Sequence, residues 1–423
     1  MKNTFFSLLI FFFYGQAFSQ NIAFQNLCND FLKGYQALDI PATGLDYKEN
    51  FASIKNAEEL KKQEVFFTGI RTKLDTKNKQ EFSKEEALRF KQLNYETSMN
   101  LERIELEKKW NEAGRKIPEG GLFKNKDWYK HYVKHFTSRN ISPEEIHVFG
   151  KTEVKKIQKQ IDSVRILLKF KNEKEFYAHL QNDTFFLKDK TSILNAYKKI
   201  DSTVRKNVTK LFSLFGIPEI AVMEWPDANV NTPPGMYLNK DQNPYGKDVF
   251  QYNFYGTKHS KRAMEWLYMH EGIPGHHFQS IFRNTFKGDS LQNRFFYFGS
   301  VEGWACYIEE YGKEMGLYQS TYSYLGKLQW DLVRSSRLVM ETGIHYYGWS
   351  REEALKYWKE NIKGQDEIAE REVTRITNWP AQSLCYKIGA MSIQKIIKKS
   401  KLNLKDAHQF VLQHCDFPLE VLL

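Results

Sequence analysis

The residue types best suited to metal chemistry gather between Met269 and Gln279, where the chain reads Met-His-Glu-Gly-Ile-Pro-Gly-His-His-Phe-Gln. In the zinc-binding pattern His-Glu-x-x-His, two imidazoles four residues apart lie on one face of a helix, because four steps of about 100° return near the start. The fourth residue after His270 is Pro274, so this chain does not match the pattern literally. A second histidine must therefore come from further along the chain.

Two histidines, His276 and His277, follow the proline and are alternatives for this second ligand. On a regular helix His276 would point about 240° away from His270. However, Pro274 lacks an N–H for the helix ladder and the glycines on either side permit unusual dihedrals, so a bulge or short break is expected. Absorbing two residues there returns His276 to the ligand face. His277 would share that face on a regular helix, but about 10.5 Å along the axis is a long span for one ion, so His276 is favoured.

A carboxylate that could complete the site is Glu302, which leads an otherwise apolar helical segment ending near Glu310. A buried carboxylate in such a segment needs a partner. Two histidines and one glutamate with an open fourth position form a catalytic zinc arrangement, in which the metal polarises a carbonyl and lowers the pKa of its water to about 7. The pattern predicts one Zn²⁺ on His270, His276 and Glu302, with Glu271 taking a proton from the metal-bound water.

Two other functions would use parts of the same pattern. Two histidines and a carboxylate also describe a non-haem iron oxygenase, but such an enzyme has no need of a general base beside its first ligand. A non-catalytic module, with a structural metal or a cleft that only captures peptides, is the second alternative. Structural zinc sites are usually closed by four ligands, often cysteines, and no cysteine pair lies near this motif. The favoured hypothesis is a zinc metallopeptidase acting on short peptides, either an exopeptidase or an oligopeptidase.

Four ordered blocks of sequence resemble those of a known bacterial family. They read His270-Glu271-Gly272-x-Pro274-Gly275-His276-His277-x-Gln279, Glu302-Gly303-Trp304-Ala305, Arg337-Leu338-Val339-x-x-Thr342-Gly343-Ile344-His345-x-x-Gly348-Trp349, and Arg375 with Pro380-x-Gln382-x-x-x-Tyr386-Lys387-Ile388-Gly389. Together they resemble the bacterial "domain of unknown function 885" family, which is grouped in one clan with the gluzincin metallopeptidases. The resemblance covers roughly residues 120–423.

The resemblance implies a mainly α-helical, gluzincin-like fold with a small β-sheet beside the metal-binding helices. It implies the same zinc ligands, His270, His276 and Glu302, and the same general base, Glu271. The chain also resembles, more distantly, the Taq-type carboxypeptidases and the angiotensin-converting enzyme group. Aligning Gly275-His276 with the Gly-His that ends their shorter motif supports His276 as the ligand.

The resemblance also implies roles for residues further along the chain. In such enzymes a downstream Tyr or His donates a hydrogen bond to the developing oxyanion, and Tyr386 and His345 fit that role. Arg375 could hold a substrate carboxylate bidentately. Each has an alternative: Tyr386 as a core tyrosine, His345 as a helix-terminal residue, and Arg375 in an ion pair with Glu372 on the same helical face.

Several positions depart from the family pattern. Glu341 stands where Asp is expected, Ile376 where Tyr is expected, and Ala381 where Gly is expected. Four residues after Glu302 stands Cys306, so the acidic residue that supports a ligand imidazole in thermolysin-type enzymes is missing at that spacing. The first three departures bear on substrate contacts, whereas the last leaves the support of the imidazoles without an assigned residue.

Short strand signals precede the metal motif, between Gly235 and Tyr255, in a stretch interrupted by prolines and glycines. Gluzincin-like enzymes place an edge strand there, and an extended peptide would bind it by strand addition. Tyr237 and Tyr255, with Tyr252, are predicted to line that cleft, although aromatic residues near a sheet are more often part of the core.

The rest of the chain is predicted to be helical. Residues 1–19 have the charged, apolar and small-residue order of a secretory signal peptide. Residues 20–120 form a helical N-terminal region with a hairpin at about 45–115, and the glycines and proline at 113–121 mark the boundary to a catalytic domain at 121–423. Ser142 followed by Pro143 predicts a helix N-cap.

Composition limits the partners. The chain has 423 residues and a net charge of +11, but both signs are mixed along it, so neither disorder nor nucleic-acid binding is predicted. The signal peptide predicts export to the periplasm or the extracellular medium.

No stable membrane anchor is expected. No apolar run reaches the roughly 20 residues of a membrane span, and Cys28 lies too far from the apolar run for a lipid anchor. Cys306 and Cys385, in apolar helical patterns, are predicted to be buried free thiols. The residues do not specify an oligomeric state.

Overall fold

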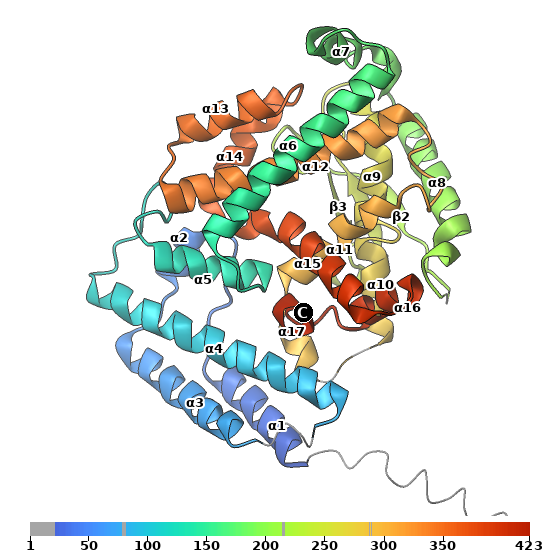
Figure 1. The fold of residues 1–423 in the computed structure, drawn as a ribbon. Helices are drawn as coiled ribbons and strands as arrows, with labels where there is room; N and C mark the ends of the chain where they lie inside the picture. Colours follow the sequence, from blue (N-terminus) through green and yellow to red (C-terminus); the bar gives the residue numbers. More distant parts are fainter. Residues whose placement is uncertain (1–21, 78–81, 214–215, 287, 289) are drawn as a thin grey trace, which may run out of the picture.

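The computed structural model describes residues 22–423 except 78–81, 214–215, 287 and 289. The predicted signal peptide, residues 1–19, lies outside the described residues. The described chain is mainly helical with two small sheets, so the prediction of a mainly α fold with a small β component is confirmed. Figure 1 shows the N-terminal helices as a layer along one side of the molecule, beside a larger body that contains the predicted site.

Four helices precede the predicted boundary, and three of them form the N-terminal layer, whereas the short helix at 47–52 packs against Trp128 in another core. Their bounds are α1 (Ile22–Ala37), α2 (Tyr47–Ala52), α3 (Ala57–Asp75) and α4 (Lys84–Glu112). Apolar residues of α1, α3 and α4, including Phe31, Phe67 and Leu93, bury one another, and Leu291 and Phe295 from a distant loop join this core. Helices α3 and α4 form the predicted hairpin, and α4 ends just before the glycines and proline at 113–121.

The middle of the chain provides two long helices and the sheets. After α5 (Lys126–Thr137) come α6 (Pro143–Leu167), α7 (Glu173–His179) and α8 (Lys190–Asn207). Helix α6 begins at the predicted cap, because Ser142 and Glu145 form a reciprocal capping box. In the three-stranded sheet, β2 (Ala221–Glu224) pairs in parallel with β4 (Val249–Tyr252), which pairs antiparallel with β3 (Gly235–Leu238). Strand β3 is therefore an edge strand. The short strands β1 (Phe186–Leu187) and β5 (His259–Ser260) form a separate pair.

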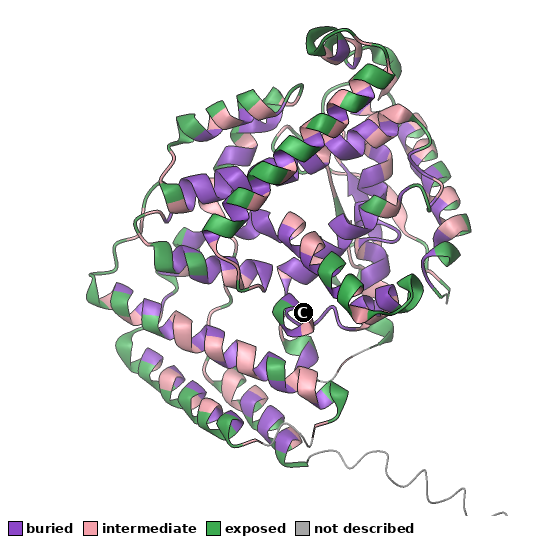
Figure 2. Cartoon of the chain, in the orientation of Figure 1, coloured by how far each residue is buried: buried purple, intermediate pink, exposed green. Residues whose placement is uncertain are grey.

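The last third of the chain forms the buried centre of the molecule and its outer cover. The central helices are α9 (Lys261–Glu271), α10 (His276–Thr285), α11 (Phe298–Ile308), α12 (Thr321–Thr342) and α15 (Cys385–Ser400). Figure 2 shows that they are mostly buried, with exposed residues on the outer helices. The outer elements are α13 (Arg351–Asn361), α14 (Ala369–Asn378), α16 (Leu404–Gln413) and α17 (Leu419–Leu422).

Two further sequence predictions concern export and the thiols. Within the described residues, no helix combines the length and the apolarity that a membrane crossing requires. Cys306 and Cys385 are free and buried, as predicted. Cys28 lies inside α1, where its side chain is only 2% exposed.

Candidate metal centre

A break in the helix separates the two candidate histidine ligands. Helix α9 ends at Glu271 and α10 begins at His276, so the predicted short break is confirmed over residues 272–275. Gly275 lies so close to the preceding turn that a β-carbon there would come within 2.0 Å of the His270 carbonyl oxygen. Only glycine fits this approach, which turns the chain and starts α10 on the same side as the end of α9.

Three side chains converge across this break. Oε2 of Glu302 lies 3.4 Å from Nε2 of His270 and 3.4 Å from Nε2 of His276. The two imidazole rings are 4.7 Å apart at 81°. The three ligand atoms all lie within 4.8 Å of one another. The structure thus brings together the three residues that the sequence predicted as zinc ligands.

The position of Glu302 depends on close helix packing. Helix α11 approaches α15 where Gly303 meets Gly389, and a β-carbon on Gly303 would lie 2.5 Å from the backbone of its partner. On the other side, Nε1 of Trp304 donates to the carbonyl of Pro274 in the break, at 2.9 Å. Helix α11 is therefore fixed to the segment between the histidines, with Glu302 facing both imidazoles.

The sequence analysis assigned no residue to support the imidazoles, and the structure shows one. Nδ1 of His270 lies 2.8 Å from Oε1 of Glu309, seven residues after Glu302. Since a carboxylate can only accept, Nδ1 of His270 donates to Glu309, and Nε2 on the other side of the ring faces Glu302. Glu309 also accepts from the buried Arg334. Although burial raises the pKa of Glu309, Arg334 and His270 hold it below its ordinary value. Position 306 holds no acidic residue, as the sequence showed, but Glu309, about one turn further along, is the acidic partner of the His270 imidazole.

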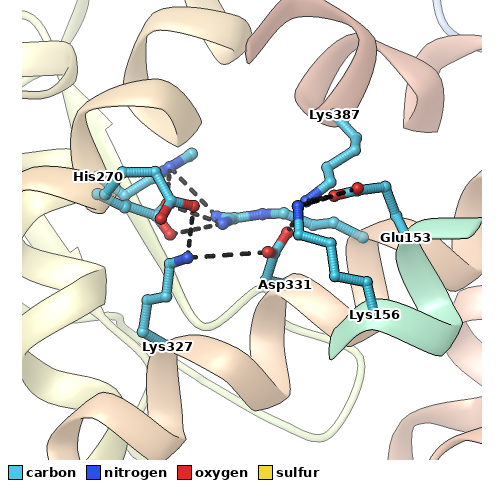
Figure 3. Close-up of polar contacts among 9 residues, drawn as sticks. Glu153, Lys156, His270, Lys327, Asp331 and Lys387 are labelled. Atoms are coloured by element: carbon cyan, nitrogen blue, oxygen red, sulfur yellow. Dashed lines mark hydrogen bonds and ion pairs between the residues drawn. The ribbon is translucent and has the colours of Figure 1, made fainter. Parts of the chain in front are cut away.

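A chain of buried charges extends away from this support. Figure 3 shows His270 on one side, Lys387 and Glu153 on the other, and Lys327 and Asp331 between them. Lys387 pairs with Asp331 at 2.6 Å and with Glu153 at 3.1 Å. Burial alone would raise the pKa of Asp331, but the positive charges of Lys387 and Lys327 lower it to about 2. The attraction between opposite charges therefore outweighs the cost of burial at this carboxylate. This row of paired charges connects α12, α15 and α6 behind the candidate centre.

The candidate general base, Glu271, lies at the end of α9 beside the edge strand. Its Oε2 accepts from the backbone N–H of Tyr237 at 2.8 Å, and its residue is 7% exposed. This contact shows that the free edge of β3 faces the end of α9, which carries the candidate ligand His270, as expected for a strand that could pair with an extended peptide. The Tyr237 side chain itself is engaged elsewhere, since its hydroxyl donates to Asp248 at 2.7 Å.

His277, the alternative ligand, takes a different position. Its side chain is fully buried, Nε2 donates to the carbonyl of Pro218, 3.2 Å away, and the ring packs 5.5 Å from that of Tyr237. It does not belong to the group formed by His270, His276 and Glu302. The structure therefore favours His276, as the break in the helix implied.

Two of the predicted substrate-side residues lie beside His270. The ring of Tyr386 stacks on the His270 ring, with centroids 6.3 Å apart and 23° between the planes. Arg375 donates to the Tyr386 hydroxyl at 2.8 Å and to Gln382 at 2.7 Å, and its Nε has no partner among the described residues. Burial raises the pKa of Tyr386, so its hydroxyl keeps its proton. The alternative ion pair with Glu372 is absent here, because that carboxylate binds Arg337 at 2.7 Å and Arg371 at 3.0 Å.

His345 is not brought to this site. It is fully buried, Nδ1 accepts from the backbone N–H of Leu122 at 3.0 Å, and Nε2 donates to the carbonyl of Ile376 at 2.8 Å. Burial lowers the His345 pKa to about 4, so the ring is neutral. With both nitrogens bonded to the backbone, the expected oxyanion role for His345 is wrong, and the residue ties three segments of the core together.

The other predicted cleft tyrosines divide between cavity and core. Tyr255 is 38% exposed and lines a cavity of about 480 Å³ next to α9. Tyr252 is 3% exposed and packs in the main core, so its predicted place in the cleft is wrong. On β4 the side chain turns inward against α8, whereas Tyr255 follows the strand and lies outside the core.

Comparison with known proteins gives a family but no activity. The chain matches the family of bacterial proteins of unknown function (DUF885) over residues 49–423, and it belongs to that family. The match begins well before residue 120, so it includes α3 and α4 as well as the predicted catalytic domain. No curated protein matches.

Two solved structures share the fold. One is described as a "putative lipoprotein" from Colwellia psychrerythraea, with 22% identity and a TM-score of 0.66 over 86% of this chain and 68% of that one. The other is a "putative lipoprotein of unknown function" from Shewanella oneidensis, with 14% identity and a TM-score of 0.62 over 95% of this chain and 86% of that one. At these identities the likeness establishes the fold alone.

Proposed function

We propose that this protein is an exported zinc-dependent metallopeptidase of gluzincin-like architecture that hydrolyses short peptides. One observation carries the proposal: Oε2 of Glu302 is buried, makes no hydrogen bond, and lies 3.4 Å from Nε2 of both histidines. Two atoms bound to zinc at about 2.0–2.1 Å in a tetrahedral site are about 3.3–3.4 Å apart. The donor set fits one zinc ion, and it leaves a fourth position open.

The residues around the group support a hydrolase over a structural site. When bound, zinc would polarise the scissile carbonyl and acidify a water. Glu271, next to His270 in the chain, would accept the proton of that water and pass it to the leaving amine. Tyr386 would donate its hydroxyl hydrogen bond to the carbonyl oxygen as negative charge develops. Arg375, whose guanidinium contacts only neutral groups, would attract a carboxylate of the peptide.

The support of His270 by Glu309 belongs to the same proposal. A metal-bound imidazole usually donates its other N–H to a carboxylate or carbonyl, which fixes the ring and raises its basicity. The bond from Nδ1 to Glu309 meets this requirement. Non-haem iron would accept the same three ligands, but Glu271 beside the first ligand favours a hydrolytic role.

We infer export from the predicted signal peptide and from the description of both similar structures as lipoproteins. For this chain we propose a protein without a lipid anchor on Cys28. That thiol is buried inside α1, so a lipid there would require the helix to unpack.

The proposal is tested with purified mature protein, zinc and a diverse peptide mixture analysed by mass spectrometry. The Glu271→Gln variant is the matched blank and Glu314→Gln, at an exposed position beyond the end of α11, is the control. We expect cleavage by wild type and the control, a loss of about 100-fold or more in Glu271→Gln, and equal zinc content in all three. Equal turnover in Glu271→Gln would refute the general base, and no cleavage by wild type would refute the peptidase.

A further inference from the structure

A cavity of about 480 Å³ opens beside the candidate metal centre, within the usual range of about 300–1,000 Å³ for small-ligand pockets. Its apolar wall includes Trp266 and Trp330, whose rings stack 5.1 Å apart at 14°. Arg262, Arg371 and Lys258 bring positive charge to it. The cavity does not include the three metal-binding candidates, so its role must be argued separately.

The cavity and the candidate metal centre are both lined by residues of α9 or next to β3. Trp266 is one turn before His270 on α9, about 6 Å along the axis. Arg334, which supports Glu309, also lies over the Trp266 ring at 5.3 Å. Pro234 lines the cavity and leads directly into β3, the strand from which the N–H of Tyr237 donates to Glu271. A peptide that lies along β3 past Glu271 would therefore enter the cavity.

The direction of such a peptide follows from the strand. The carbonyl of Pro234 accepts from Asn253, so residues 234, 236 and 238 bond towards β4, and Gly235 and Tyr237 face the free edge. The contact of the Tyr237 N–H with Glu271 agrees with this alternation. Antiparallel pairs are two to three times commoner than parallel ones. An antiparallel peptide would have its carboxyl end at the Pro234 end of β3, where the cavity lies.

The charges of the cavity point to the same end of a peptide. The side chains that line it include three cations and one carboxylate, Glu367, which is exposed. Lys258 is paired with Asp183, and Arg371 with Glu372. Arg262 has no ion pair with any residue that the structure describes. Among the described residues it donates a hydrogen bond only to the carbonyl of Leu180, and its buried Nε has no hydrogen-bond partner. Its guanidinium also lies over the rings of Phe185 and Phe186, at 5.4 and 5.8 Å, which supply no formal negative charge.

A cation left in this state is costly. Burial lowers the pKa of Arg262 to about 10, and no carboxylate opposes the shift. Buried charges in proteins are normally paired, so an anion entering the cavity would supply what the folded chain lacks. A carboxylate suits a guanidinium because two parallel hydrogen bonds can form.

We propose that this cavity binds the carboxyl-terminal end of a peptide substrate, with the terminal carboxylate on Arg262 and an apolar side chain against Trp266 and Trp330. The proposal rests on the peptidase function proposed above. Arg262 is about 12 Å from His270 along α9, and an extended chain advances about 3.3 Å per residue. Cleavage at the metal would then release short carboxyl-terminal peptides of about two to four residues.

Binding is tested apart from hydrolysis with the zinc-loaded Glu271→Gln protein. Isothermal titration calorimetry compares one hexapeptide, with Phe as its penultimate residue, as the free acid and as the carboxyl-terminal amide. We expect the acid to bind at least about tenfold more tightly. Arg262→Gln should remove this preference, Arg262→Lys should keep part of it, and Lys261→Gln, a neighbouring exposed cation outside the cavity, should leave it unchanged. Equal binding of acid and amide by the parent protein would overturn the proposal.

The wild-type products give the second arm. Release of carboxyl-terminal peptides of two to four residues from the acid, with slower cleavage of the amide, supports the site. Release of single residues would overturn it and place the carboxylate on Arg375 instead. Preferred binding of the acid without any cleavage would support the carboxylate site and refute the peptidase function. Equal cleavage of acid and amide would support the peptidase function and refute the carboxylate site.

Discussion

The two histidines of the candidate metal centre, His270 and His276, differ from the core histidine His345 in what their ring nitrogens contact. His270 and His276 direct Nε2 at a carboxylate oxygen of Glu302 that makes no hydrogen bond, and Nδ1 of His270 contacts Glu309 and Arg334. His345 has both nitrogens bonded to backbone groups. All three side chains are largely buried, so burial does not separate a ligand from a core residue. The partner of Nε2 does, since Nε2 faces a carboxylate oxygen in His270 and His276 but a backbone carbonyl in His345.

The largest expected effect separates the two neighbouring histidines. His276→Ala should lower zinc affinity by more than about 100-fold, because it removes a direct ligand. His277→Ala should keep zinc binding and lose only stability, since its ring contacts Pro218 and Tyr237. Zinc content after dialysis against a weak chelator measures both. Loss of zinc in His277→Ala alone would reverse the assignment.

The next effect concerns the support of His270. Glu309→Gln should weaken zinc affinity by about 10–100-fold, because the imidazole loses its anionic partner and Arg334 loses its counter-ion. Glu314→Gln, at an exposed position five residues further along the chain, is the matched control. A competition titration with a chromophoric chelator gives both affinities, and equal values would show that the contact does not tune the metal.

The core histidine should show the opposite behaviour. His345→Ala should lower the free energy of unfolding by about 3 kcal/mol, because it leaves a cavity and two unpaired backbone groups, at Leu122 and Ile376. Its zinc content should equal that of wild type. Denaturant unfolding and metal analysis are done on the same sample. A loss of zinc with little loss of stability would return His345 to the site.

The smallest effect is the pH dependence of the same residue. The pKa of His345 is about 4 in the folded protein against about 6.5 when unfolded. The unfolded state therefore binds its proton first, so the stability from this group is complete above pH 6.5 and is lost as the pH falls towards 4. Between pH 7 and 5 the loss should be about 1–2 kcal/mol, and it should be absent in His345→Ala. Parallel pH profiles for the two proteins would contradict the neutral buried ring.

The parts of the fold that local chemistry determines could be predicted from the sequence. The break at 272–275 follows from Pro274 and its glycines, and α6 begins at Ser142 because the capping residues are adjacent in the chain. Choosing His276 over His277 needed only this break. The strand signals before α9 likewise gave the small sheet, because prolines and glycines bound each short strand.

The parts that depend on contacts between distant segments could not be predicted. Glu309 lies two turns after Glu302, beyond the end of α11, and a fixed spacing taken from other enzymes points to Cys306 instead. Arg334 comes from α12, and nothing near it in the chain shows that it meets Glu309. The prediction for His345 failed for the same reason, since its two backbone partners, at residues 122 and 376, are far from it in the sequence.

The loop between α10 and α11 has a practical consequence for anyone shortening the chain. It inserts Leu291 and Phe295 into the core of α1, α3 and α4, so the N-terminal layer covers apolar surface of the site-bearing body. A protein truncated to residues 121–423 would expose that surface together with the face of α5 that contacts α4. Such a fragment should aggregate during expression, because a large exposed apolar surface favours association.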